Sequence, residues 1–262
     1  MPPRHAFSAV PHQSLSESVY RQLRDKIVRR ELAAGAPLPA ERELSEMLGV
    51  NRGAVREAIK RLQQAGLVAV RHGGNHVVLD FQAEGGLELL PSLLVDSSGN
   101  IAPSVARSVM AMRSALAPDI AASAAGKGGA KLADELDAVV QRMRATSEIA
   151  ALQELALEFW GRLVNAGGNI AYRLAFNTMN KTYRKVWGLL TKVMAAEFRD
   201  LDNLQDLADA VRKGDTERAR ACAQSHVDIG RKALEGVLGK LPSPAGAPSP
   251  AAARRPLPRG EK

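Results

Sequence analysis

Two arginines one helical turn apart, Arg52 and Arg56, are the residues of this sequence best suited to contacts with a polyanion. An arginine guanidinium donates hydrogen bonds in a planar fork, which matches phosphate oxygens and the guanine O6 and N7 acceptors in a DNA major groove. Asn51 precedes them and is a favourable helix N-cap, because its side-chain oxygen can accept a free backbone N–H. The spacing therefore predicts a helix that begins after Asn51 and presents both guanidinium groups on one face.

The remainder of this helix must supply an apolar face for packing. Apolar side chains recur at helical spacing along one arc, which predicts an amphipathic helix. They are Ala54, Val55, Ala58, Ile59, Leu62 and Ala65. Lys60 and Arg61 fall on the opposite arc and are predicted to face outward.

A shorter helix is predicted just before it, from near Ala40 to Gly49, with Leu44, Met47 and Leu48 on its apolar face. Two helices joined by a short turn that contains glycine are typical of a helix-turn-helix. The β-branched runs that follow, 67–71 and 76–79, are separated by a glycine-rich stretch. They predict a β-hairpin, which in this position forms a wing.

An upstream helix is predicted from a capping box at Ser14 to about Leu32. It would pack behind the helix-turn-helix through an apolar stripe. Its arginines are predicted to face solvent: Arg21, Arg24, Arg29 and Arg30.

Several of these motifs resemble the DNA-binding domain of the GntR family of bacterial transcription regulators. They include residues 39–45, 49–52, 55–58 and 71–73. The resemblance implies that the second helix, the start of the third helix and the wing tip hold operator DNA. The matching positions in this sequence are Arg42, Asn51, Arg52, Gly53, Ala54, Arg56, His72 and Gly73.

Beyond the predicted wing, the sequence indicates a short polar linker and then helical periodicity only. Residues 87–95 form an apolar segment that is expected to wedge between the domains. The predicted helices lie near 102–125, 130–145, 149–166, 169–195, 199–213 and 216–238. The fold class is therefore mainly α, a winged helix-turn-helix of three helices and a hairpin followed by an all-helical effector-binding bundle. The predicted divisions are a disordered arm 1–13, a DNA-binding domain 14–80, a linker 81–100, a ligand-binding and dimerisation domain 101–240, and a disordered basic tail 241–262.

The helical half resembles the effector domains of the FadR subfamily of GntR regulators, through residues 110–116, 155–160, 165–169, 210–215 and His226. The candidate ligand-binding residues are Arg113, Asn169, Asn177, Tyr183 and His226. Asn169 is equally well suited to a helix N-cap, and His226 to a hydrogen-bonded core histidine. One branch of the subfamily binds a metal, but the corresponding positions here are Ala156, Trp160, Leu204 and His226. One imidazole does not hold a divalent ion, so no metal and no other cofactor are expected.

The resemblance implies a transcription regulator that binds a palindromic operator in double-stranded DNA as a homodimer, with an affinity that a small acidic metabolite changes. Residues 86–90 and 168–172 favour the branch that responds to long-chain acyl-CoA and regulates fatty acid metabolism, as repressor or activator. Alternatives are a response to another organic acid, and a constitutive architectural DNA binder without an effector. An enzyme is not expected, because the chain offers no paired carboxylates, activated nucleophile or phosphate loop.

Composition agrees with these expectations. The 262-residue chain has a formal net charge of +8, which suits a nucleic acid because each phosphate neutralised by Lys or Arg releases counterions. Its single cysteine, Cys222, excludes an internal disulfide. No membrane-length apolar run and no secretory-type leader are present, so a cytoplasmic protein without a membrane partner is expected.

Overall fold

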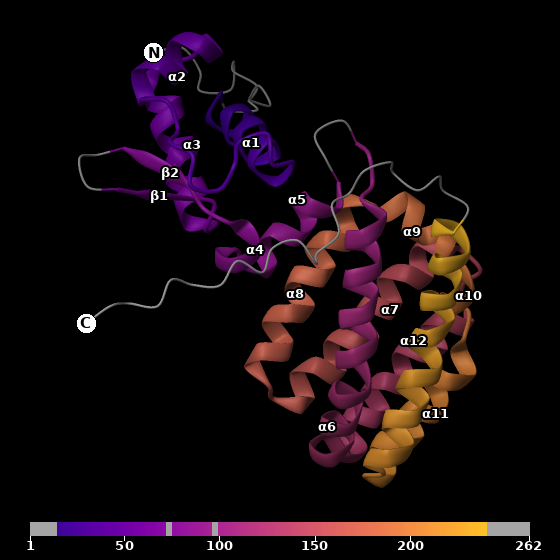
Figure 1. The fold of residues 1–262 in the computed structure, drawn as a ribbon. Helices are drawn as coiled ribbons and strands as arrows, with labels where there is room; N and C mark the ends of the chain where they lie inside the picture. Colours follow the sequence, from indigo (N-terminus) through magenta and orange to yellow (C-terminus); the bar gives the residue numbers. More distant parts are fainter. Residues whose placement is uncertain (1–14, 72–74, 96–98, 240–262) are drawn as a thin grey trace, which may run out of the picture.

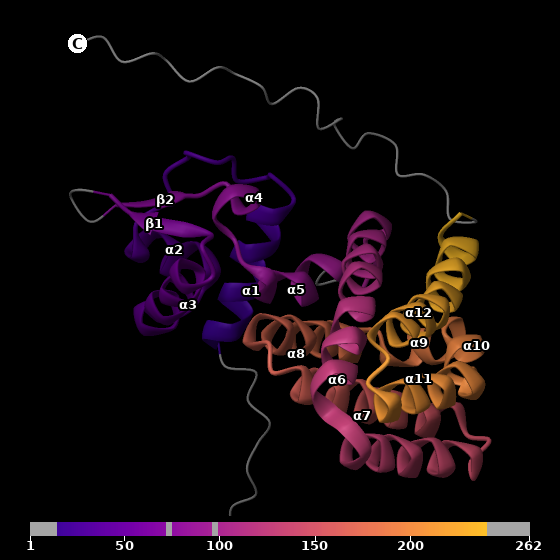
Figure 2. The same ribbon diagram turned by 90° about the horizontal axis from the view of Figure 1, so that it is seen from below.

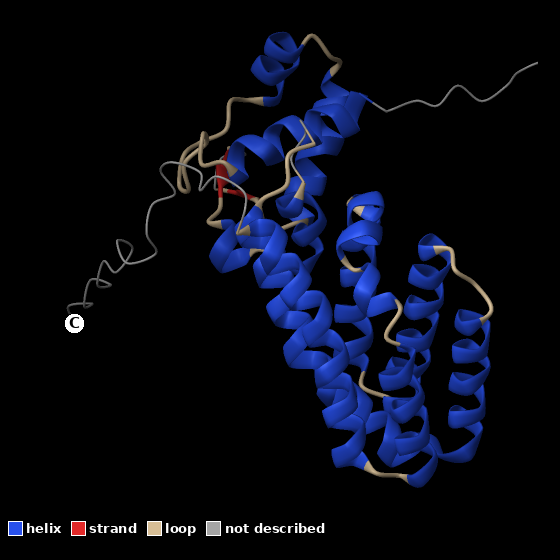
Figure 3. Ribbon diagram, turned by 90° about the vertical axis from the view of Figure 1, so that its right-hand side faces the viewer, coloured by secondary structure: helices blue, strands red, loops and turns tan. Residues whose placement is uncertain are grey.

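The computed structural model describes residues 15–71, 75–95 and 99–239. They form a small N-terminal unit of helices and a hairpin, and a larger unit that is helical throughout (Figure 1). In Figure 3 the strands are confined to the N-terminal unit. The predicted fold class is confirmed. The predicted arm, tail and wing tip, with Ser14, His72 and Gly73, lie outside the described residues.

The N-terminal unit consists of α1 Leu15–Val28, α2 Glu41–Leu48, α3 Arg52–Gln64, β1 Val68–Val70 and β2 His76–Val78. Its core lies between α1 and α3, where buried Leu23 and Ile27 meet Val55, Ile59 and Leu62. The prediction that the first helix runs to Leu32 is wrong: α1 ends at Val28, and Arg30 takes a left-handed conformation with φ 60°.

Helices α2 and α3 have the predicted caps at the turn between them, Gly49 and Asn51. At the start of α2, the Glu43 carboxylate accepts a hydrogen bond from the Ala40 backbone N–H at 3.2 Å, a contact that the sequence had not indicated. Gly49 ends α2 in the left-handed region, with φ 64°, and Asn51 Oδ1 accepts from the Ala54 N–H at 2.8 Å. Met47, by contrast, is 73% exposed, so its predicted place on the buried face of α2 is wrong.

The hairpin is antiparallel, with Val68 opposite Val78 and Val70 opposite His76. The segment before α2 pairs with the free edge of β2: the Gly35 N–H donates to the Val78 carbonyl and the Leu38 N–H to the His76 carbonyl. Strand β2 is thereby paired on both sides, which fixes the direction in which the wing leaves the core.

The predicted linker contains short helices: α4 Phe81–Glu84, η1 Leu87–Leu89 and α5 Leu90–Leu94. Leu89 is buried in the core of the N-terminal unit and Leu94 in the core of the helical unit, as expected of a wedge. Helix α5 packs against α8 of the helical unit. Seen from below, α5 lies between α1 and the large helices (Figure 2).

The helical unit contains α6 Pro103–Arg144, α7 Ile149–Gly167, α8 Ile170–Lys185, α9 Trp187–Val193, α10 Ala195–Phe198, α11 Leu201–Lys213 and α12 Thr216–Leu238. Its core lies between the long helices and includes the fully buried Leu136, Phe159, Leu207 and Val227.

Two predicted boundaries in this unit have different outcomes. The break predicted after residue 125 is present as a kink within α6, at Gly129 with φ 60°. The single helix predicted over 169–195 is divided at Val186, which separates α8 from α9. None of the described helices has the length and apolar character needed to cross a membrane.

Candidate nucleic-acid interface and ligand cavity

The outer face of α3 carries the predicted arginines. Arg52 and Arg56 are both exposed, one turn apart, next to the Asn51 cap. Within the described part of the chain Arg52 forms no ion pair. Arg56 donates from Nε and Nη2 to Glu41 Oε2 at 3.2 and 3.0 Å, and this hydrogen bond raises its pKa. Glu41 thus holds Arg56 toward α2 while its guanidinium stays accessible.

The other described candidates lie around this pair. Arg42 of α2 is exposed, with Nη1 4.0 Å from Glu46 at the surface. Gly53 is exposed and Ala54 half-buried at the start of α3, where small side chains permit close approach to a surface. The structure therefore leaves Arg42, Asn51, Arg52 and Arg56 exposed on the helix-turn-helix. This surface can donate hydrogen bonds to phosphates and to base edges.

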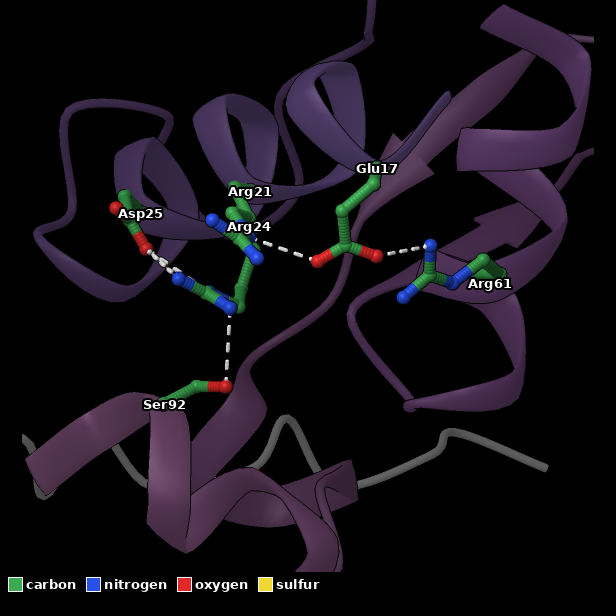
Figure 4. Close-up of polar contacts among 6 residues, drawn as sticks. All are labelled: Glu17, Arg21, Arg24, Asp25, Arg61 and Ser92. Carbon is green, nitrogen blue, oxygen red and sulfur yellow. Dashed lines mark hydrogen bonds and ion pairs between the residues drawn. The ribbon is translucent and has the colours of Figure 1, made fainter. Parts of the chain in front are cut away.

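Arg61 was predicted to face outward from α3, and its side chain is 41% exposed but also contacts α1. Its Nη1 donates to Glu17 of α1 at 2.6 Å (Figure 4). Its guanidinium also lies 4.2 Å from the centre of the Tyr20 ring. Burial would raise the pKa of Glu17, but hydrogen bonds from Arg61 and Arg21 lower it. A long side chain at the edge of the helix has reached a carboxylate on α1, so Arg61 fastens α3 to α1.

Arg24 was also predicted to face solvent and is instead 7% exposed. Its Nε and Nη2 donate to Asp25 Oδ1 at 2.8 and 2.6 Å, and its Nη1 donates to Ser92 Oγ of α5 at 3.0 Å (Figure 4). This side chain links the N-terminal unit to the helical segment that leads into the larger unit.

A cavity of about 50 Å³ lies between α6, α7, α8, α9 and α10. Its walls are mostly apolar and include Ile120, Phe176, Met179 and Leu190. Of the predicted ligand residues, Arg113 and Tyr183 line it.

Arg113 forms a buried ion pair with Glu197 of α10. Arg113 Nη1 donates to Glu197 Oε2 at 2.7 Å, and Nη2 contacts Glu197 Oε1. The Glu197 side chain is 1% exposed. Burial would lower the pKa of Arg113, but the Glu197 charge raises it above the usual range. Glu197 had not been singled out from the sequence, nor had Gly230 of α12, where a Cβ would overlap the Glu197 carboxylate.

His226 lies behind Glu197 and does not line the cavity. It is fully buried, with Nδ1 2.9 Å from Asp200 Oδ2 and Nε2 3.7 Å from Glu197 Oε1. Burial would raise the pKa of Asp200, but its hydrogen bonds with His226 and Asn203 lower it. His226 is therefore a hydrogen-bonded core histidine that can reach a ligand only through Glu197.

Asn169 and Asn177 were expected at the cavity, and neither lines it. Asn169 is the exposed N-cap of α8, where its Oδ1 accepts from the Ala171 and Tyr172 N–H groups at 2.9 and 3.3 Å. Asn177 is half-buried on α8. The Asn169 side chain is therefore engaged as a helix N-cap, which was the alternative role predicted for it.

The positions that correspond to the metal ligands of the related branch do not all line the cavity. Ala156 and Trp160 line the cavity, and Leu204 is buried in the core of the helical unit. Over the described residues no cluster of three His, Cys, Asp or Glu side chains is arranged to hold a metal ion.

Comparisons with known proteins cover both units. Residues 15–78 match the model of the bacterial regulatory proteins, gntR family. Residues 108–229 match that of the FCD domain. The chain is 36% identical over 233 residues to the HTH-type transcriptional regulator Mce2R of Mycobacterium tuberculosis, covering 89% of this chain and 97% of that protein.

The chain is also 25% identical over 202 residues to the fatty acid metabolism regulator protein of Proteus mirabilis, covering 77% of this chain and 83% of that protein. A solved structure, of the Lar protein that controls expression of the Listeria monocytogenes agr system, matches with a TM-score of 0.54 at 18% identity. It covers 87% of this chain and 100% of its own, and supports the fold alone.

Proposed function

Because this chain belongs to the GntR family of bacterial regulatory proteins and carries an FCD domain, we propose that it binds a palindromic operator as a homodimer. Its affinity for the operator changes when a small acidic metabolite binds to the helical unit. Its family and relatives are transcriptional regulators. The chain is accordingly a DNA-binding transcription regulator of the GntR type and not an enzyme. Such a protein acts where the chromosome lies, so the proposal places it in the bacterial cytoplasm.

One observation supports the DNA-binding part of the proposal: an exposed pair of arginines lies on a capped helix, next to a hairpin whose strand β2 is paired on both sides. The N-terminal residues of a recognition helix contact base edges in the major groove, and a dimer matches two half-sites of a palindrome. The proposed DNA-binding residues are Arg42, Asn51, Arg52, Gly53, Ala54, Arg56, His72 and Gly73. The last two lie outside the described residues.

The effector half of the proposal rests on the cavity. It is enclosed by apolar walls and has a few polar groups, which is the usual character of a ligand site. The name of the Proteus mirabilis relative, a fatty acid metabolism regulator, favours long-chain acyl-CoA as the effector. Its charged phosphates would stay outside the cavity and its acyl thioester would enter. Arg113 and Tyr183 are proposed to contact the ligand, with His226 acting through Glu197.

An effector changes DNA affinity only if it binds differently to the DNA-competent and DNA-incompetent arrangements of the two winged units. Helix α5 is the proposed connection, because Leu89 and Leu94 enter different cores and Ser92 accepts a hydrogen bond from Arg24. A ligand that shifts α8 or α9 would move α5 and with it the N-terminal unit.

The test is a mobility-shift titration on the DNA upstream of the chain's own gene, with and without long-chain acyl-CoA. The proposal expects specific binding at physiological salt and a change of at least fivefold in the dissociation constant on addition of effector. Binding that discriminates poorly against random DNA would refute the operator. Specific binding that no acyl-CoA or organic acid alters would favour an architectural protein.

A further inference from the structure

An open groove lies between α7, α8 and the end of α6, outside the apolar cavity. Its volume is about 650 Å³. The charged residues of its lining are Arg142, Arg173, Arg184, Glu154 and Glu158. Three guanidinium groups face two carboxylates, so the described lining carries one positive charge in excess. A groove of this composition attracts an anion if one of its arginines lacks a partner within the protein.

Both carboxylates of the groove have arginine partners. Glu158 accepts hydrogen bonds from Arg162 Nη2 at 2.8 Å and from Arg142 Nη1 at 2.9 and 3.0 Å. These hydrogen bonds lower the pKa of Glu158, although partial burial opposes them. Glu154 lies 3.7 Å from Arg184 Nη1, and both side chains are more than half exposed. Such a surface pair contributes little to stability, so Arg184 can exchange Glu154 for another anion.

Arg173, on α8, is the arginine in excess. It forms no ion pair within the described part of the chain, and its Nη1 is buried without a hydrogen-bond partner. Its guanidinium instead lies 5.5 Å from the centre of the Phe176 ring. A buried donor normally has a partner, and a guanidinium only donates and stays charged. The partner that Arg173 lacks is therefore an acceptor, and a negative charge suits it best.

A second buried group without a partner lies on the same face of α8. Asn180 follows Arg173 by seven residues and precedes Arg184 by four, so the three side chains form one stripe along the helix. Arg173 and Asn180 are about 10 Å apart along the helix axis, and Arg184 lies about 6 Å further on. The Asn180 Oδ1 is buried and makes no hydrogen bond. Turning the amide over places its Nδ2, a donor, at the same position.

We propose that this groove binds a phosphate-bearing anion, held by Arg173 and Asn180 and contacted at its far end by Arg184. The donors approach from separated points along α8, so the ligand must direct its oxygens several ways. A tetrahedral phosphate does this and a planar carboxylate does not, and the guanidinium fork matches phosphate oxygens. Glu154 and Glu158 repel an anion, which keeps the affinity modest.

The groove and the apolar cavity are neighbours but separate sites. Leu157 and Phe176 line both of them, and Arg173 lines the groove only. A phosphate held by Arg173 thus lies next to a wall of the cavity without entering its apolar interior. The inference goes beyond the proposed effector function, because it does not depend on what the cavity binds.

The proposal is tested by calorimetric titration of the full-length protein at constant ionic strength. The probes are pyrophosphate, inorganic phosphate and succinate, none of which carries an apolar chain. Pyrophosphate is expected to bind with a dissociation constant of about 1 mM or tighter, and inorganic phosphate more weakly because it cannot reach both arginines. Succinate should bind at least about tenfold more weakly than pyrophosphate. The absence of saturable pyrophosphate binding overturns the proposal, and so does succinate binding as tight as that of pyrophosphate.

Variants of the stripe locate the anion. Arg173→Gln is expected to weaken pyrophosphate binding by about tenfold or more, the scale of one hydrogen bond to a charged group. Arg173→Lys keeps the charge but loses the fork, so it should lie between Arg173→Gln and the native protein. Arg144→Gln is the matched control, because that exposed arginine is 3.6 Å from Asp202 and does not line the groove. Equal pyrophosphate affinity in Arg173→Gln and the native protein contradicts the assignment.

The exposed arginines of α3 also attract anions, so Arg52→Gln is titrated in parallel. A loss of pyrophosphate binding in Arg52→Gln but not in Arg173→Gln places the anion on the DNA-binding surface and overturns the proposal. Operator affinity without added phosphate is expected to be the same in Arg173→Gln as in the native protein. The groove and the operator are thus tested separately, since either can fail while the other stands.

Discussion

The arginines of α3 and the arginine of the cavity have the same side chain but opposite environments. Arg52 is exposed and Arg56 is accessible beside Glu41, whereas Arg113 is buried against Glu197. An exposed guanidinium keeps its charge available for an external polyanion and releases counterions on binding. A buried one must be neutralised from within. The net charge of +8 is therefore informative about partners only through the residues that remain at the surface.

The two regions also differ in what holds them in place. The starts of α2 and α3 are each fixed by a hydrogen bond between residues close in the chain. The cavity depends on a pair from helices far apart in the chain, Arg113 on α6 and Glu197 on α10. A substitution in the first region should mainly change what is bound. A substitution in the second should first change stability.

The largest effect is expected from Arg113→Ala, which leaves the Glu197 carboxylate buried without its partner. The free energy of unfolding should fall by about 3–5 kcal/mol. Urea denaturation followed by circular dichroism measures it. Arg52→Ala, an exposed substitution, should change the same quantity by no more than about 0.5 kcal/mol. Similar small losses in both variants would remove the contrast between the regions.

For operator affinity, in contrast to stability, the larger effect is expected from Arg52→Ala. Arg52→Ala is expected to cost about 1–3 kcal/mol of specific binding if its guanidinium contacts a base edge. Fluorescence anisotropy on operator and on random duplex measures both affinities at one salt concentration. Arg142→Ala, an exposed arginine paired with Glu158 in the helical unit, is the control and should leave both unchanged. An equal loss on both duplexes would mean that Arg52 contacts phosphate only.

The sequence predicted the DNA-binding side of this contrast better than the cavity. Gly49 predicts the end of α2 and Asn51 the start of α3, because capping depends only on residues that are close in the sequence. Arg24 was misplaced, and the contact of Arg61 with Glu17 was not foreseen, because helical periodicity assigns a side chain to a face but does not show that a serine or carboxylate on another element is within reach. Val186, where α8 ends, is neither Gly nor Pro, so the sequence contained no breaker at that point.

The cavity needed long-range information. Arg113 was selected because its segment resembles a known family. Its partner Glu197 lies on the short helix α10, in the gap between the predicted helices 169–195 and 199–213. Asn169 had two predicted roles, and the cap is the one that the geometry supports. The short helices between the units were missed because each has only three to five residues, too few to show a helical periodicity.

The connection between the regions should show a smaller effect. Ser92→Ala removes the hydrogen bond from Arg24 to α5 while Arg24 keeps Asp25. The coupling free energy between effector and operator should fall by about 0.5 kcal/mol or more, the scale seen for residues along a coupling route. It is measured as the ratio of operator affinities with and without effector. Ser108→Ala on the exposed surface of α6 serves as the control, and an unchanged ratio in Ser92→Ala would place the coupling elsewhere.

The smallest effect at neutral pH concerns Tyr183, whose pKa is raised to about 12 by burial, against 10.0 when unperturbed. The folded state favours the protonated phenol, so its contribution to stability is complete below pH 10 and is lost as pH rises toward 12. Urea denaturation at a series of alkaline pH values should show this loss in the native protein. Tyr183→Phe should lack that part of the loss, and identical pH profiles would contradict a buried, protonated Tyr183.

The central claim is that α3 reads base edges through its exposed arginines, and a cycle between protein and DNA tests it most directly. Operator affinity is measured for the native protein and for Arg52→Ala, on duplexes with guanine or with 7-deazaguanine, which lacks the N7 acceptor. If Arg52 donates to guanine, the modified operator weakens the native protein by about 1 kcal/mol or more and has little further effect on Arg52→Ala. Additive losses at every guanine of the operator would contradict the account.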